Sequence, residues 1–354
     1  MTVPAAEDQV WLSQGKIAVL GTGYALPGPP LSTEILLDRI AARSKIPRRR
    51  AALAAALAHR MAIDTRHICR DFADATEAAR PGHANPDLAA IAVTRALADA
   101  DLAIGDIGYL IGHTATPLQP LPANIAFVAD RLGYRGPHLE LRQACTGFAN
   151  ALMIAFGLLA APGARPVAIV GSETGSLFFD PRRVAEDLGQ LVNMVQMGDG
   201  AAAIILGPAN SATAGITAAW FGAIGLGRAP GLQMHASGAG EFDHDVVAIR
   251  ASGASLFEAG REAAARHGVT LDTVDTIIPH QVSGVIGAQS AAHFGRPVER
   301  FFVNADRLGN TGSAAIWLAL AALREARPAA GARALVLGAE ATKYMHGGFV
   351  YEHG

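Results

Sequence analysis

The stretch "ELRQACTGFANAL", residues 140–152, places Cys145 between the end of a predicted strand and the start of a predicted helix. A similar stretch, "RLGNTGSAAIWLALAAL" at 307–323, returns later in the chain with Asn310 in the position of Cys145. In both, a turn of small residues leads into an apolar, Ala-rich helix. The sequence therefore predicts the same strand, turn and helix in two places.

The segments around these turns repeat in the same order. His113 precedes Cys145 by 32 residues and His280 precedes Asn310 by 30, and each histidine follows an apolar run. Four matched pairs in one order indicate a duplicated unit. The other pairs are "IGYLIGHTAT" (107–116) with "VDTIIPHQVS" (274–283), "RPVAIVGSET" (165–174) with "RALVLGAEAT" (333–342), and "GDGAAAIILG" (198–207) with "GGFVYEH" (347–353).

Apolar runs rich in Val, Ile and Leu alternate with Ala-rich helical segments, as in parallel sheets covered by helices. We therefore expect an α/β protein made of two duplicated halves, residues 1–210 and 211–354. The boundary falls near "GPANSATAG" (207–215), a run of small and turn-forming residues. The first half holds the candidate nucleophile and an inserted cap or dimer segment, and the second holds the matching His and Asn.

The composition is that of a well-buried globular protein, with 51% hydrophobic and 17% charged residues in a chain of 354. A net charge of −2 gives no overall field that favours nucleic acid. The longest apolar stretch, residues 151–161, is too short to span a membrane, and no signal peptide is expected. Two cysteines without a Cys-x-x-Cys pair argue against a disulfide framework or a zinc site. We expect a cytoplasmic protein with a free thiol.

The duplicated turns predict a chemical site. A helix N-terminus favours negative charge, so it would lower the pKa of the Cys145 thiol and supply backbone donors for an oxyanion. A pseudo-two-fold relation would bring His280 and Asn310 of the second half to Cys145 of the first. The imidazole would activate the thiol, and the Asn amide would bind a carbonyl oxygen without titrating. Together the three residues predict an acyl-thioester site.

Each of these signals also has a plain structural explanation. A lone Cys in an apolar helix is usually buried and inert, and "GNTGS" is a normal turn and helix cap. A His after a strand is usually a loop residue with satisfied hydrogen bonds. The placement of all three within the repeat favours the chemical interpretation. His113, the repeat partner of His280, and Cys69 are expected to be structural.

The motifs "QACTGFANAL", "GDGAAAIILG", "IIPHQ" and "GNTGSAA" resemble those of β-ketoacyl-acyl-carrier-protein synthase III, within the thiolase fold. The resemblance spans most of the chain and implies a homodimer of five-layered αβαβα subunits. It also implies that "HTATPLQPLPANIAFVADRLG" (113–133) lies at the dimer interface. Arg66, in "IDTRHICRDF" (63–72), matches an arginine that contacts the coenzyme A nucleotide in the family.

The resemblance implies a decarboxylative condensation. Cys145 would accept an acyl group from acyl-CoA or an acyl carrier protein, and His280 and Asn310 would hold a malonyl thioester as carbon dioxide leaves. The enolate would attack acyl-Cys145 to give a 3-oxoacyl product. The backbone N–H groups of Cys145 and of Gly347 or Gly348 would form the oxyanion hole. No bound metal or redox cofactor is expected.

Three segments depart from the family pattern. "PHQVSGVIG" (279–287) replaces the usual continuation after "PHQ", which affects docking of the phosphopantetheine arm. "GAEATKYMHGGFVY" (338–351) is expected to be a longer, bulkier loop beside the acyl site. "SKIPRRRAALAAALAHRMA" (44–62) is an extension expected to cap the entrance, and Arg48, Arg49 and Arg50 within it are candidates for docking an acidic carrier protein. Fatty-acid initiation and a specialised, polyketide-like pathway both remain open.

Two other functions are compatible with the same motifs. The first is an acyltransferase of the same fold that passes the acyl group to an alcohol or amine without decarboxylation. Asn310 favours condensation over this, because decarboxylation needs a neutral donor at the enolate oxygen. The second is a non-catalytic partner subunit of an active paralogue. The complete set of Cys145, His280 and Asn310 argues against it.

Overall fold

The computed structural model describes residues 9–71, 78–209, 214–234 and 241–354. The main feature is a sheet of ten strands, which consists of two similar parts joined where β2 and β9 pair at Ile17 and Ile216. The first part has the order β2 (Ile17–Ala25), β8 (Asp199–Pro208), β7 (Val167–Thr174), β5 (Tyr109–His113) and β6 (His138–Leu141). The second has the order β12 (Thr276–Pro279), β13 (Arg333–Glu340), β14 (Met345–Glu352), β9 (Gly215–Ala223) and β1 (Trp11–Leu12).

The two parts have the same strand directions. In the first, β5 runs parallel to β7, and β7 and β2 each run antiparallel to β8. In the second, β12 runs parallel to β13, and β13 and β9 each run antiparallel to β14. The strand pairs follow the predicted sequence repeat. The expected boundary at residues 210 and 211 lies outside the described residues, between the end of β8 and the start of β9.

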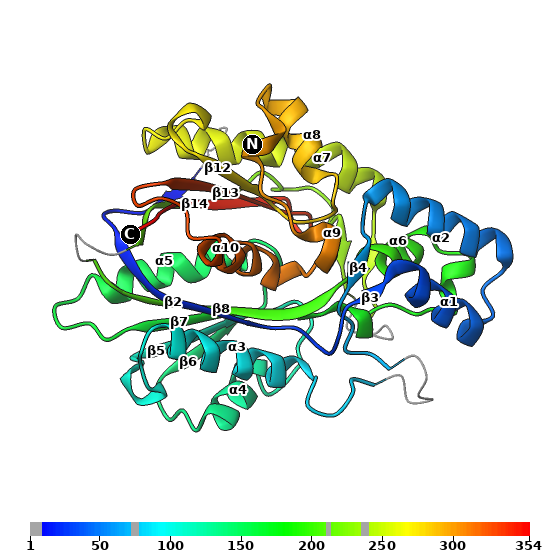
Figure 1. Ribbon diagram of the computed structural model, residues 1–354, viewed down its shortest axis with the longest axis horizontal. Coiled ribbons are helices and arrows are strands. Elements are labelled where there is room, and N and C mark those ends of the chain that lie inside the picture. Colours follow the sequence, from blue (N-terminus) through cyan, green and yellow to red (C-terminus); the bar gives the residue numbers. More distant parts are fainter. Residues whose placement is uncertain (1–8, 72–77, 210–213, 235–240) are drawn as a thin grey trace, which may run out of the picture.

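Helices form three layers around the two parts of the sheet (Figure 1). The central helices, α5 (Gly147–Leu159) and α10 (Ala315–Glu325), lie between the sheets and are apolar on nearly all sides, as buried helices are. On the outer faces, α3 (Asn85–Asp99) and α4 (Asn124–Leu132) cover the first part, and α7 (Val246–Arg266) and α8 (Ile286–Phe294) cover the second. The order of layers is αβαβα, as expected.

The central layer is closed by aromatic packing at the starts of its two helices. Phe148 of α5 contacts Trp317 of α10 with ring centroids 5.9 Å apart, and Phe349 of β14 lies 5.7 Å from each. All three side chains are buried. Such edge-to-face and stacked contacts fix the relative position of the two helices. They therefore also fix the turns in front of those helices, where Cys145 and Asn310 lie.

A separate lobe packs at one end of this body (Figure 1). It consists of α1 (Thr33–Ser44), α2 (Arg48–Met61) and α6 (Leu188–Gln196), with a core of its own that includes Leu36, Ile40 and Leu191. The short elements nearby are β3 (Leu31–Ser32), β4 (Thr65–Arg66), β10 (Leu232–Gln233), β11 (Asp243–His244) and α9 (Ala305–Leu308). The described helices include none that is both long and apolar enough to cross a bilayer.

Candidate active site

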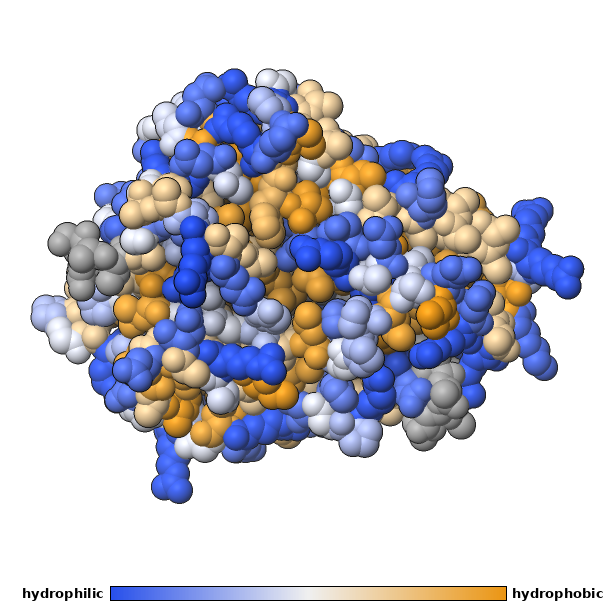
Figure 2. All heavy atoms as spheres, in the orientation of Figure 1, coloured by the Kyte–Doolittle hydropathy of each residue, from blue (hydrophilic) through white to orange (hydrophobic). Residues whose placement is uncertain are grey.

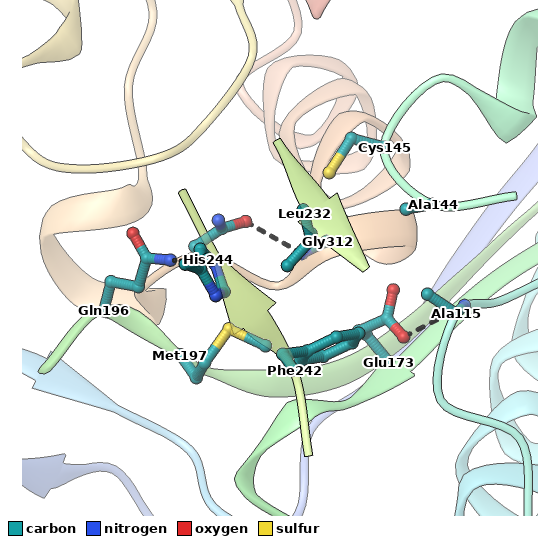
Figure 3. Close-up of a pocket in the computed structure, with 11 residues that line it drawn as sticks. Ala115, Ala144, Cys145, Glu173, Gln196, Met197, Leu232, Phe242, His244 and Gly312 are labelled. Carbon is teal, nitrogen blue, oxygen red and sulfur yellow. Dashed lines mark hydrogen bonds between the residues drawn. The ribbon is translucent and has the colours of Figure 1, made fainter. Parts of the chain in front are cut away.

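Cys145 lies in the turn between β6 and α5, with Thr146 at the N-cap of the helix. The side chain is only partly buried, and its sulfur points into a pocket (Figure 3). Its backbone N–H donates to no backbone carbonyl within the described part of the chain. A backbone N–H beside a nucleophile is suited to stabilise a developing oxyanion. The turn thus presents both a thiol and a backbone donor.

The pocket at Cys145 is formed by both halves of the protein. Ala115, Ala144 and Glu173 come from the first half, and Asn310 and Gly312 come from the second. Met197, Leu232 and Phe242 add apolar surface, and Gln196 and His244 add polar groups. The structure therefore brings Cys145 and Asn310 to one pocket, as the pseudo-two-fold relation predicts.

Asn310 is held by its backbone and by its side-chain oxygen. Its N–H donates to the Gln196 carbonyl at 2.7 Å, and its carbonyl accepts from the Gly198 N–H at 3.1 Å. Oδ1 accepts from the Gly312 N–H at 3.0 Å. The side-chain oxygen is used in this turn, so the NH₂ group is the part of the amide that remains for a ligand.

His280 follows the last residue of β12, and its N–H donates to the Leu337 carbonyl at 2.8 Å. It is not among the residues that line the pocket with Cys145 and Asn310. Nδ1 is buried without a hydrogen-bond partner among the described residues. Burial lowers the pKa of His280 to about 4, so the ring is neutral near pH 7 and can accept a proton. The expected convergence of His280 with the other two residues stays a prediction.

Two buried glutamates, which the sequence reasoning missed, lie at matching strand ends. Glu340 ends β13, and its Oε2 accepts from the N–H and the hydroxyl of Thr146 at 2.8 and 2.7 Å. Glu173 lies near the end of β7, and its Oε2 accepts from the N–H and the hydroxyl of Ser313 at 3.0 and 2.8 Å. Each carboxylate thus closes the helix start of the other half. The signal was present, because both repeated strands read Gly-x-Glu at their ends.

These carboxylates overturn the expected pKa of Cys145. Burial, then the negative charge of Glu340, then that of Glu173 raise the pKa of the thiol well above its ordinary value. The helix start does favour an anion, but Glu340 already supplies one. Cys145 therefore rests as a thiol, and the expectation that its position lowers the pKa was wrong.

His244 of β11 is a second functional candidate that the sequence reasoning missed. It lines the pocket, its Nε2 lies 3.5 Å from Nε2 of Gln196, and its buried Nδ1 has no partner among the described residues. Burial lowers its pKa to about 4. No motif marks this residue, because β10 and β11 are two-residue strands whose place depends on tertiary contacts.

Comparison with known proteins identifies the family. Residues 139–225 match the family described as 3-oxoacyl-[acyl-carrier-protein] synthase III, and residues 264–351 match its C-terminal part. The 3-oxopimeloyl-[acyl-carrier-protein] synthase of Rhodothermus marinus is 33% identical over 256 residues, which are 68% of this chain and 72% of that protein. The chain belongs to the 3-oxoacyl-acyl-carrier-protein synthase III family. It is a condensing enzyme of the ketosynthase type.

Other synthase III relatives agree over nearly the whole chain. The β-ketoacyl-[acyl-carrier-protein] synthase III of Rhizorhabdus wittichii is 29% identical over 322 residues, covering 88% of this chain and 92% of that protein. The solved structure of AbyA1, a tetronic acid condensing enzyme, is 29% identical with a TM-score of 0.82 and covers 95% and 99% of the two chains. The 3-oxoacyl-(acyl carrier protein) synthase III of Pseudomonas aeruginosa is 27% identical with a TM-score of 0.76, covering 96% and 98%.

The structure corrects the role expected for Arg66 of this synthase III. The side chain is 0% exposed. Its guanidinium donates to backbone carbonyls at the end of α6, those of Val195 and of Met194 (3.3 Å), and to the Thr33 hydroxyl at 2.7 Å. Burial lowers its pKa to about 10, so it stays charged. Arg66 links α1 to the end of α6, and in this position it cannot reach a nucleotide at the surface.

The role of Gly347 or Gly348 as the second oxyanion donor stays a prediction. Both glycines lie within β14, which pairs with β13 on one side and β9 on the other. These two glycines are needed for packing, because a Cβ would lie 2.5 Å from Cβ of Ala149 or 2.2 Å from the ring of Trp220. The donor role of the Cys145 N–H likewise stays a prediction.

The segment 338–351 is a hairpin and not the long loop expected. β13 continues to Glu340, residues 341–344 turn, and β14 begins at Met345. The extension 44–62 contains the whole of α2, and its end contacts the loop after His280, where the Gly284 N–H donates to the Met61 carbonyl at 2.9 Å. Its role as a cap stays a prediction.

His113 and Cys69 have the structural surroundings that we expected. Nε2 of His113 accepts from the indole N–H of Trp317 at 3.0 Å, and the ring is 1% exposed. Burial lowers its pKa to about 3. Cys69 is 0% exposed, and its N–H donates to the Asp199 carboxylate at 2.7 Å. Neither side chain lines the pocket.

Proposed function

We propose that this synthase III forms a 3-oxoacyl thioester by decarboxylative Claisen condensation. The acyl donor is an acyl-CoA or an acyl carrier protein, and the extender is a malonyl thioester. The observation that carries the proposal is the shared pocket of Cys145 and Asn310, a nucleophile and a neutral donor from opposite halves. This arrangement is what an acyl-enzyme followed by an enolate requires.

In the loading step, the Cys145 thiol gives its proton to neutral His280 as sulfur attacks the acyl carbonyl carbon. The Cys145 N–H stabilises the oxyanion. The carbon–sulfur bond to the donor breaks, and the departing thiolate takes the proton from the imidazolium. His280 is neutral near pH 7, so a ring nitrogen has a free lone pair to accept this proton.

In the condensation step, the NH₂ group of Asn310 and the His280 ring donate to the malonyl thioester carbonyl. The bond to the carboxylate carbon breaks, carbon dioxide leaves, and the electron pair forms the enolate. The enolate carbon attacks acyl-Cys145, the carbon–sulfur bond breaks, and the Cys145 thiolate takes up one proton from solvent to restore the thiol. Two hydrogen-bond donors at this position stabilise the enolate oxygen.

The test combines mass spectrometry and carbon dioxide release. Incubation with acyl-CoA should add one acyl mass on Cys145, and malonyl thioester should then release labelled carbon dioxide with a 3-oxoacyl product. Cys145→Ala should give no adduct and lose condensation by at least about 10³-fold. An adduct without carbon dioxide release, and transfer to an added alcohol or amine, would show the acyltransferase instead. No adduct on the purified chain would indicate a non-catalytic subunit.

We also propose that an acyl carrier protein docks on the lobe. Residues 33–62 hold seven Lys or Arg and two Asp or Glu, in a chain with totals of 29 and 31. Arg48 and Arg49 at the start of α2 are exposed, and Figure 2 shows hydrophilic side chains projecting from this end of the molecule. An acidic partner would be attracted to such a patch.

Docking is tested by replacing Arg48, Arg49 and Arg50 with Ala. The KM for a carrier-bound substrate should rise about tenfold, and the KM for the same acyl group on coenzyme A should not change. Exposed Arg250 and Arg266 on α7, replaced in the same way, are the matched control. An unchanged KM for the carrier-bound substrate would refute the proposal.

A homodimer is proposed through the segment 113–133. Leu118 and Leu121 in this segment are 47% and 83% exposed, which leaves apolar surface for a second copy to cover. Sedimentation velocity should show a dimer for the native chain. Replacing both leucines with Ser should shift it toward monomer, and a native chain that sediments as a monomer would contradict the proposal.

A further inference from the structure

The carboxylate of Glu340 occupies the helix start that carries the nucleophile. Its Oε2 accepts both from the N–H of Thr146, the residue after Cys145, and from the Thr146 hydroxyl, at 2.8 and 2.7 Å. Oε1 accepts from the Thr342 hydroxyl, and the side chain is 3% exposed. Glu340 therefore has a fixed position. It belongs to the second half of the protein and bonds the residue that follows Cys145 in the first half.

The other ionisable groups around Cys145 add no positive charge. Glu173 of β7 lines the same pocket, as does His244 of β11, and His113 of β5 lies behind the turn, where it would meet a Cβ at Gly147. Both histidines have lowered pKa values and are neutral near pH 7. No Lys or Arg is found among the described residues that line the pocket. A thiolate at Cys145 would face two carboxylates and no cation.

We propose that Glu340 is a positioning residue that holds the Cys145 turn closed and keeps Cys145 in its thiol form between reaction cycles. The inference rests on the proposed function for its consequence in catalysis. The hydrogen bonds to Thr146 fix the turn, and the negative charge disfavours the thiolate by Coulomb repulsion in a water-poor site.

The proposed arrangement makes loading depend on a base. The thiol proton must pass to His280 while the carbon–sulfur bond forms, because a free thiolate is disfavoured beside Glu340 and Glu173. A resting thiol is also less open to oxidation than a thiolate.

Glu340→Gln separates charge from geometry, because the amide oxygen can still accept from both donors of Thr146. The measurement is the pH dependence of iodoacetamide alkylation at Cys145, followed on its own peptide so that buried Cys69 does not contribute. The inflection should move to lower pH, and alkylation at pH 7 should be roughly three- to tenfold faster. An unchanged profile would overturn the proposal.

Two further measurements keep the test decisive. Glu340→Asp retains the charge on a shorter side chain, so its inflection should remain at the native pH, and an inflection at the Glu340→Gln position would contradict a charge effect. Should Glu340→Gln fail to fold, the native chain itself decides: an inflection at or below the ordinary cysteine value of about 8.5 would overturn the proposal. Alkylation needs no acyl substrate, so failure of acyl loading would count against the proposed function alone.

Discussion

The two helix starts at Cys145 and Asn310 share a turn motif and a bonded glutamate, but the glutamate bonds a different position in each. Both follow a turn of the form x-Thr-Gly, and both receive a buried glutamate from the other half. Glu340 binds one residue after Cys145, whereas Glu173 binds Ser313, three residues after Asn310. The buried glutamate thus lies directly beside the thiol in one turn, and it bonds two residues farther along the chain in the turn that carries Asn310.

The histidines of the two halves differ more. His113 accepts from Trp317, so its ring is committed to the core. Nδ1 is buried with no hydrogen-bond partner among the described residues in both His113 and His280. The two rings differ at Nε2, which in His113 is already used by the indole N–H of Trp317. The duplication therefore provides a histidine at the same backbone position in both halves, and the proposed reaction uses only one of them.

The largest expected effect separates Asn310 from Cys145. Asn310→Ala should lower the rate of condensation by about 10² to 10³-fold, because the enolate oxygen loses a donor. Loading of Cys145 should continue, since the thiol and the Cys145 N–H are untouched. Acyl adduct mass and carbon dioxide release measure the two steps separately. Equal loss of both steps would mean that the two positions do not have distinct roles.

The histidines should respond in opposite ways to the same substitution. His280→Asn should reduce condensation by about 10²-fold or more while changing stability little. His113→Asn should cost about 1–3 kcal/mol of unfolding free energy, because the Trp317 N–H loses its acceptor, while activity of the folded protein remains. Steady-state kinetics and chemical denaturation of both variants provide the comparison. A catalytic defect in His113→Asn would contradict the division of roles.

The glycines of the two turns should both resist a side chain. A Cβ at Gly147 would lie 2.7 Å from Nδ1 of His113, and one at Gly312 would lie 2.5 Å from Oε2 of Glu173. Ala at either position should destabilise by about 1–3 kcal/mol, and by more at Gly312, whose φ is +49°.

The control for these substitutions is Gly157 in the same helix α5. A Cβ there meets no atom within 4 Å, so Gly157→Ala should stabilise by about 0.5–1 kcal/mol. Chemical denaturation measures all three. Stabilisation at Gly147 or Gly312 would show that the turns are looser than the structure indicates.

The smallest effect concerns pH, where the two histidines should behave alike. The folded pKa values of His113 and His280, about 3 and about 4, lie below the ordinary value of 6.5. The unfolded chain therefore binds protons first, so stability present above pH 6.5 is lost as pH falls toward the folded values. From pH 6.5 to 5.5 each histidine should cost about 1 kcal/mol.

This loss is measured as a difference between chains. The difference in unfolding free energy between the native chain and His280→Asn, and between the native chain and His113→Asn, should move by about 1 kcal/mol in favour of the variant between those two pH values. Burial alone sets this effect, so it does not depend on which histidine is used in catalysis. A difference that stays constant with pH would show that the ring in question is not buried in its neutral form.

The sequence was sufficient where the repeat carried the information. The strands, the two central helices and the pairing of Cys145 with Asn310 follow from matched segments, because local pattern decides them. The sequence was insufficient where the role of a residue depends on the direction in which its side chain or its N–H points. Arg66 and Gly347 were assigned by motif, but whether a guanidinium faces solvent, or an N–H faces a pocket or a neighbouring strand, depends on the packed sheet.

The prediction that the pKa of the Cys145 thiol is lowered failed for a related reason. A helix start taken alone lowers a thiol pKa, and only the folded chain shows that a carboxylate from residue 340 is already there. The repeat did contain the two glutamates. They stand at the ends of buried strands, however, and nothing in the sequence indicated which groups would donate hydrogen bonds to them. His244 had no signal of any kind, since its strand is two residues long.

The exchange of glutamates makes each half a cofolding partner of the other. A fragment ending after β8 would keep Glu173 and the α5 start, and would lose the Ser313 donors to Glu173 Oε2 and the Glu340 acceptor of Thr146. A buried group left unpaired, such as the Thr146 N–H, costs about 1–3 kcal/mol. The complementary fragment would lack the same four bonds. The two halves of the chain therefore complete each other's hydrogen bonds only when they are in contact, and they do so at the turn that carries the nucleophile.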